Sequence, residues 1–228
     1  MVLVAQAAQS ERVKFIQRTY THLAGAVAAF VVLEFALFNS PLAKMIFRLL
    51  AANSFMWLVV LGGFALLGWL ARELASRTSS LQSQYIGLGL YVVAEAIIFV
   101  PLLFIAINFS SPAVLPNAVV LTGALFAGLT AIVFTTGKDF SFLRGALTIG
   151  GFIALGLIIC SILFGFSLGL WFSLAMIVFA GAAILYDTSN ILHHFSTDQY
   201  VAASLELFAS VALLFWYVLR ILMELNRR

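Results

Sequence analysis

The chain alternates between long apolar segments and short polar breaks. Seven apolar segments stand out, at 20–39, 55–71, 85–108, 117–136, 144–166, 169–192 and 201–222. Each approaches the roughly 20 residues that an α-helix needs to cross about 30 Å of hydrocarbon. No segment alternates apolar and polar residues with a period of two, as the strands of a membrane β-barrel do. The pattern therefore predicts an all-α integral membrane protein with seven transmembrane helices.

The breaks have recognisable local causes. Asn39, Ser40 and Pro41 end the first segment, and Gly137 lies in a charged turn after the fourth. We also expect a tight polar turn from Ser110 to Asn117, because two prolines lie in it. The resulting organisation is a tail at 1–19, a seven-helix membrane domain at 20–222 and a short C-terminal tail at 223–228.

Basic residues indicate the orientation in the membrane. Counted on alternate sides, seven lie on the side of the N-terminus (Arg12, Lys14, Arg18, Arg72, Arg77, Lys138 and Arg144) and five lie opposite (Lys44, Arg48, Arg220, Arg227 and Arg228). Because cytoplasmic loops carry the excess of Lys and Arg, we expect a cytoplasmic N-terminus.

Composition narrows the class of protein. Hydrophobic residues make up 64% of the 228 positions and charged residues only 9%, whereas a soluble domain is about a quarter charged. This excludes a soluble enzyme, a disordered chain and a nucleic-acid binder, and leaves membrane lipids as the surroundings. No nucleophile with a positioned base is recognisable, so we expect a non-enzymatic protein without a cofactor. Intramembrane hydrolysis by buried acids remains the enzymatic alternative.

Four acids lie within the apolar segments: Glu34, Glu95, Asp187 and Glu206. An intramembrane charge costs about 2.5–3.5 kcal/mol on insertion scales unless it is paired or neutralised, so each is a candidate functional residue. Glu95 is in the middle of its segment. Glu34 is near the end of the first segment, where reaching the interface is the alternative.

Asp187 and Glu206 are the strongest candidates, because they are equidistant from the middle of the turn at 193–200. Two antiparallel helices joined by this turn would hold both carboxylates at the same depth, with Ser210 one helical turn beyond Glu206. Two close carboxylates resist double ionisation and retain a proton near neutral pH. When ionised, they offer the oxygen ligands that Ca²⁺ prefers. The structural alternative is that both acids reach the membrane interface.

Other polar residues carry weaker signals. His193, His194 and Asp198 match no common metal-ligand spacing, which favours solvated turn residues. Arg220, near the end of the last segment, fits equally an interface anchor and a partner for a buried acid.

Four stretches resemble the Bax inhibitor-1 (transmembrane Bax inhibitor motif) family, in particular its bacterial YccA-like branch. They are R-T-Y-T-H-L at 18–23, T-G-K-D-F-S-F-L at 136–143, L-Y-D-T-S-N-I-L at 185–192 and Y-V-L-R-I-L at 217–222. The resemblance implies a seven-helix bundle with the last helix in the centre, located in the bacterial inner membrane.

The resemblance implies two activities. One is a modulator of the membrane AAA protease FtsH, for which the polar N-terminal tail would be the segment that the protease grips. The other is a pH-sensitive calcium leak governed by two aspartates. The first of these falls at Asp187 and the second at Ser210, so Glu206 would have to replace it from one turn away. The family's arginine falls at Arg220, and its acidic partner is missing from 55–71.

Overall fold

The computed structural model describes residues 2–75 and 80–226, and these ranges are almost entirely helical. The elements are η1 (Val4–Gln6), α1 (Gln9–Phe38), α2 (Leu42–Ala52), α3 (Ser54–Leu74), α4 (Leu81–Phe109), α5 (Val114–Thr136), α6 (Leu143–Phe164), α7 (Gly169–His193) and α8 (Tyr200–Asn226). All except η1 and α2 are long and apolar enough to cross a membrane. The expected seven transmembrane helices are confirmed. Arg77, Arg227 and Arg228, used in the charge count, lie outside the described residues.

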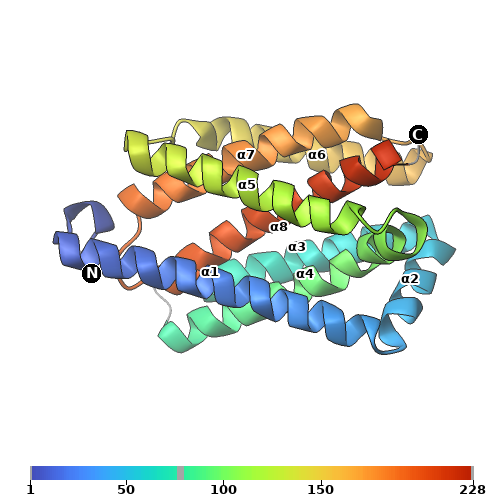
Figure 1. Cartoon of the computed structure of the whole chain (residues 1–228), viewed down its shortest axis with the longest axis horizontal. Coiled ribbons are helices and arrows are strands. Elements are labelled where there is room, and N and C mark those ends of the chain that lie inside the picture. Colours follow the sequence, from blue (N-terminus) through green and yellow to red (C-terminus); the bar gives the residue numbers. More distant parts are fainter. Residues whose placement is uncertain (1, 76–79, 227–228) are drawn as a thin grey trace.

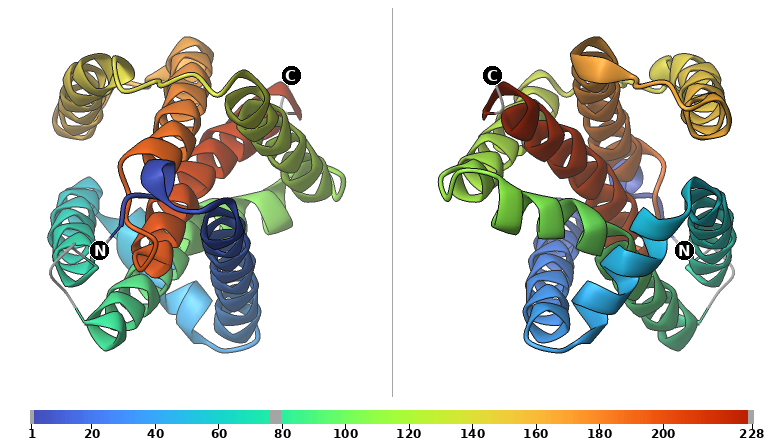
Figure 2. Two further views of the ribbon diagram at one scale, coloured as in Figure 1. Left: turned by 90° about the vertical axis from the view of Figure 1, so that its left-hand side faces the viewer. Right: turned by 90° about the vertical axis from the view of Figure 1, so that its right-hand side faces the viewer.

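Helix α8 runs through the middle of the bundle (Figure 1) and packs against α1, α4, α5 and α7. Over half of its apolar window, 56%, is buried, and 67% of that of α4 is buried, whereas the other five spans bury 22% or less. The end-on views show the remaining helices arranged around these two (Figure 2). The expected central position of the last helix is therefore confirmed.

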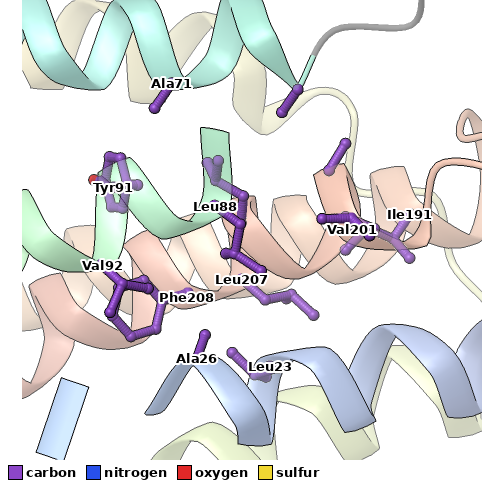
Figure 3. Close-up of a cluster of buried hydrophobic side chains, with 14 of the residues drawn as sticks. Leu23, Ala26, Ala71, Leu88, Tyr91, Val92, Ile191, Val201, Leu207 and Phe208 are labelled. Carbon is purple, nitrogen blue, oxygen red and sulfur yellow. The ribbon is translucent and has the colours of Figure 1, made fainter. Parts of the chain in front are cut away.

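The core on the N-terminal side joins α1, α3, α4, α7 and α8. Figure 3 shows Leu23 and Ala26 of α1 facing Leu207 and Phe208 of α8, with Leu88 and Tyr91 of α4 beside them. Burying one Leu or Phe side chain contributes about 1.5–3 kcal/mol. Because little hydrophobic drive acts between helices within lipid, small residues set how closely they approach. Gly87 of α4 lies against the backbone of α3, where a Cβ would come within 2.5 Å of the Ala71 carbonyl oxygen.

Several helix ends follow the predicted breaks. α5 ends at Gly137, whose φ of 61° is left-handed, and α6 ends in the same way at Gly165. The side chain of Asn53 accepts a hydrogen bond from the Phe55 N–H and begins α3. Pro116 is not in the connecting turn as expected but in the first turn of α5, where its missing N–H needs no partner.

Two features differ from the sequence expectation. The segment at 42–52, which is apolar apart from Lys44 and Arg48, forms α2, which buries Ala43 and Leu50 and exposes both basic residues. In addition, α1 begins at Gln9, eleven residues before the expected span, so most of 1–19 is helical. The segment at 42–52 is too short to span a bilayer and carries two charges, and residues 9–19 are mostly polar, so neither belongs to the span-length apolar pattern.

The residues before α1 are attached to the α7–α8 loop. The Val4 N–H donates to the Phe195 carbonyl at 2.9 Å, and the Thr197 N–H donates to the Val2 carbonyl at 3.1 Å. Leu3 and Ser196 form an antiparallel bridge between these bonds. We call residues 2–7 the N-terminal strap.

Candidate functional site: a polar cluster in a transmembrane cavity

A cavity of about 1520 Å³ lies between α3, α4, α6, α7 and α8. Its lining on α8 extends from Glu206 to Glu224, eighteen residues or about 27 Å along the helix, close to the roughly 30 Å of a bilayer core. The N-terminal end of the cavity is the end at which α8 begins and α3 and α7 finish. Most ionisable residues of the wall gather at that end.

Asp187 and Glu206 both line this cavity near its N-terminal end. Each is six residues from the end of its helix at the α7–α8 loop, so the antiparallel hairpin holds them at a similar depth. In the described structure they do not bond to each other. The Ser210 hydroxyl donates a hydrogen bond to Asp187 Oδ2, and Glu206 has a different partner.

Glu206 pairs with Arg72 of α3. Arg72 Nε lies 3.4 Å from Glu206 Oε2, and the guanidinium lies over the ring of Tyr91, 5.7 Å from its centroid. The cluster thus joins α3, α4, α7 and α8 through one arginine, two carboxylates, a hydroxyl and an aromatic ring. Because charges interact strongly within a low-dielectric region, Arg72 attracts the carboxylates around it.

The supporting residues fall in three places. Glu95, one turn from Tyr91 on α4, is buried and lines the same cavity. Arg220 lines the opposite end, about 21 Å along α8 from Glu206. Glu34 is buried on α1 outside the cavity wall, and neither of its carboxylate oxygens has a hydrogen-bond partner among the described residues. Of the site residues expected from sequence, only Asp187, Glu206, Ser210 and Glu95 lie close together.

Arg72, Tyr91 and Arg144 were not predicted. Arg72 follows the apolar segment 55–71 and entered the sequence analysis only as a basic residue on the N-terminal side, yet α3 continues to Leu74. That segment is three residues shorter than the roughly 20 needed to span a bilayer. The shortage is the signal that Arg72 belongs to the helix and needs an acidic partner.

As a cation site, the cluster offers carboxylate and hydroxyl oxygens, which fit Ca²⁺ in kind. Ca²⁺ takes six to eight oxygen ligands, and no set of three or more His, Cys, Asp or Glu side chains is arranged to hold a metal in the described part of the chain. Asp187, Glu206 and Ser210 therefore suit a hydrated cation in passage better than a tightly held one.

Outside the membrane, Asp139 connects the α5–α6 loop to the end of α7. It accepts a hydrogen bond from the Ser141 N–H at 2.8 Å and lies 3.9 Å from His194 Nε2. The buried Ser189 hydroxyl accepts from the Phe140 N–H at 2.8 Å. The backbone hydrogen bond from Ser141, with the nearby histidines, lowers the pKa of Asp139 below its usual 3.8. His193 is the last residue of α7, and His194 follows as its C-cap.

Comparisons with known proteins agree with this architecture. The family described as "Inhibitor of apoptosis-promoting Bax1" matches residues 12–228. Bax inhibitor 1 of Schizosaccharomyces pombe is 32% identical over 230 residues, covering 96% of this chain and 79% of that protein. An uncharacterized protein of Pseudomonas aeruginosa is 40% identical over 109 residues, about half of each chain (47% and 49%). A Vibrio cholerae protein described as a membrane protein is 34% identical over 119 residues, 51% of this chain and 52% of that protein. The chain is a multi-span membrane protein and belongs to the Bax inhibitor-1 family.

Proposed function

We propose that this protein is a proton-sensitive leak for cations, Ca²⁺ among them, across the bacterial inner membrane. The observation that carries the proposal is the Asp187, Ser210, Glu206 and Arg72 cluster on the wall of a cavity nearly as long as the bilayer is thick. An ionisable cluster inside a membrane protein, facing a cavity, is typical of ion and proton pathways.

The charges of the cavity wall favour cations over anions. Its acids are Glu95, Asp187, Glu206 and Glu224, and its basic residues are Arg72, Arg144 and Arg220. With all of them ionised, four acids against three arginines leave one net negative charge. Rings and walls with excess carboxylate select cations in channels.

The Arg72–Glu206 pair supplies the proton sensitivity. With Glu206 ionised, the pair holds the end of α3 against α8. Protonation of Glu206 removes one charge of the pair, so α3 loses this attachment and the N-terminal end of the cavity widens. We therefore expect leak to increase as the pH falls.

The test is Ca²⁺ entry into proteoliposomes that contain an indicator dye, measured across a pH series. Asp187→Asn and Glu206→Gln each shift the pH midpoint, because each removes a proton-binding group from the cluster. Glu34→Gln is the matched control, since Glu34 is an intramembrane acid outside the cavity wall. If both cluster variants leak like the wild type, the proposal is wrong.

A second function is supported by the N-terminal region. The first turns of α1 carry exposed charged residues, among them Glu11 and Lys14, beyond the length needed to cross the bilayer. They follow the apolar N-terminal strap, which is attached to the α7–α8 loop. This exposed charged surface fits binding to the FtsH protease, with a cytoplasmic N-terminus, and modulation of its activity.

For this second function the strap must detach before the protease can pull on it. Val4, fully buried, fixes the strap to the core. Val4→Asp should release the strap and speed degradation of the protein in cells that contain FtsH, whereas Val2→Asp, at a half-exposed position, should not. Equal lifetimes of wild type and Val4→Asp, or equal lifetimes with and without FtsH, would exclude the strap as the initiation segment.

A further inference from the structure

The middle of the cavity has a different chemistry from its N-terminal end. Between the levels of Glu95 and Arg220 the wall is mostly aliphatic and aromatic. It includes Ile98, Leu102 and Ile105 of α4, Leu155 and Ile158 of α6, and Trp216 of α8. Trp216 packs edge-on against Phe99, with ring centroids 5.0 Å apart. This part of the cavity suits an apolar occupant.

The size of the cavity argues against an empty space. Small-molecule pockets are about 300–1,000 Å³, and this cavity is about 1520 Å³. An apolar void destabilises a fold by about 24 cal/mol per Å³, and water does not occupy a region whose walls offer it no polar partners. A flexible hydrocarbon chain fills such a volume without either cost.

The cavity is open at the depth where hydrocarbon surrounds the protein. Phe152 and Leu155 line it and are also 73% and 44% exposed. Both lie near the midpoint of α6, which runs from Leu143 to Phe164. The medium at the middle of a transmembrane helix is lipid acyl chains. A chain from the bilayer therefore has direct access along α6.

A positively charged side chain, Arg144, lies at the end of the cavity where a lipid headgroup would be. Arg144, the second residue of α6, lines the N-terminal end of the cavity, and the described residues hold no ion pair with its side chain. Arg72 at the same end is already paired with Glu206. Guanidinium groups bind phosphate with paired hydrogen bonds, and a basic residue at the membrane surface attracts anionic lipids by about 1 kcal/mol.

We propose that the cavity is a binding site for one acyl chain of a membrane phospholipid, with the lipid phosphate at Arg144. A chain in this position separates Asp187 and Glu206 from Arg220 and blocks the cavity. This regulatory consequence rests on the proposed leak, whereas the lipid site itself does not.

The test measures contact between the chain and Trp216. A variant that keeps only Trp216, with Trp57, Trp69 and Trp171 changed to Phe, is placed in phosphatidylcholine vesicles with dibrominated acyl chains. Bromine quenches tryptophan emission at short range. The reference has all four tryptophans changed to Phe and carries Val178→Trp. Val178 is 73% exposed on α7 and lies at nearly the same distance from the α7–α8 loop as Trp216.

We expect bromine to quench Trp216 about as strongly as Val178→Trp and aqueous iodide to leave Trp216 unchanged. Ala183→Leu, which adds three carbons to the cavity wall, should reduce the bromine quenching of Trp216 at least about twofold by displacing the chain. Ala182→Leu is the control, because Ala182 lines a separate groove beside α5.

Three results would overturn the proposal. Quenching of Trp216 by iodide alone means that water fills the cavity, and quenching by neither probe means that the cavity is closed. Bromine quenching that Ala183→Leu does not change means that lipid reaches Trp216 from outside the cavity. These results do not depend on ion flux, so a failed leak measurement leaves the lipid site intact.

Two measurements complete the design. Arg144→Gln should weaken the preference of the site for brominated phosphatidylglycerol over phosphatidylcholine by about fivefold, the equivalent of about 1 kcal/mol. An unchanged preference would remove Arg144 from the site. Mass spectrometry of the wild-type protein released from detergent should show a retained phospholipid, which Ala183→Leu loses. This second readout needs no tryptophan substitutions.

Discussion

Arg72 and Glu206, separated by 134 positions in the chain, form an ion pair between the end of α3 and the beginning of α8. The pair lies at the N-terminal end of a cavity that extends along α8. The pair is a direct side-chain attachment of α3 to the central helix.

Arg72→Gln should raise the Ca²⁺ leak at neutral pH and make it less dependent on pH. Without the arginine, the ion pair that holds the end of α3 against α8 is absent at every pH. Ca²⁺ entry into proteoliposomes across a pH series measures both effects. Arg48→Gln, on the exposed face of α2, is the control. A leak with the same size and pH dependence in wild type and Arg72→Gln contradicts the assigned role of Arg72.

Ser210→Ala should shift the pH midpoint of the Ca²⁺ leak, because the Ser210 hydroxyl donates a hydrogen bond to Asp187 in the same cluster as the Arg72–Glu206 pair. A hydrogen bond to a charged group contributes about 1.5–3 kcal/mol, so the shift should reach about one pH unit. Ser210→Asp should shift it further, since two carboxylates then face each other. Ser204→Ala is the matched control on the same helix, because the Ser204 hydroxyl bonds to the Val201 carbonyl within α8. Equal midpoints in all these proteins would remove Ser210 from the sensor.

Gly87→Ala should destabilise the protein by about 1–3 kcal/mol, the usual cost of forcing extra atoms into a packed contact. The new methyl group would meet the Ala71 carbonyl of α3 and force the two helices apart. Gly89→Ala meets nothing within 4 Å and should be neutral or slightly stabilising, because Ala favours a helix by about 1 kcal/mol over Gly. Thermal unfolding in detergent compares the two. Equal unfolding temperatures would show that α3 and α4 do not depend on the close approach at Gly87.

Asp139→Asn should reduce the stability of the folded protein at neutral pH. It should also make that stability less dependent on pH in the acidic range. The folded state lowers the pKa of Asp139, so its contribution is complete above the ordinary value of 3.8 and is lost as the pH falls below it. Thermal unfolding between pH 3 and pH 7 would show a smaller acid-dependent loss in Asp139→Asn than in the wild type. Asp198→Asn, at an exposed position in the α7–α8 loop, should keep the wild-type slope. Parallel slopes for wild type and Asp139→Asn would contradict the prediction.

The transmembrane helices and the depth of the principal acids followed from sequence. A long apolar segment by itself indicates a transmembrane helix. A short loop between two antiparallel helices determines which residues of α7 and α8 lie at the same depth in the membrane. This is why Asp187 and Glu206 could be placed at one depth before the bonding partner of either was known.

The partners themselves depend on contacts between distant segments. Arg72 follows an apolar run, so its sequence context is that of a loop, and only the packing of α3 against α4 directs it to Glu206. The contacts of the strap could not be predicted from sequence for the same reason. Val2, Leu3 and Val4 form a short apolar run before a charged stretch, but nothing local indicates that they pair with residues 195–197.

The bridge between Leu3 and Ser196 also sets an order of events during synthesis. Residues 2–4 are synthesised long before residues 195–197 and must wait for them before they can form their bonds. Until α7 and α8 have entered the membrane, Val4 has no core to enter. A docked strap therefore reports that α7 and α8 have been made and assembled, and an undocked strap marks a molecule in which they have not.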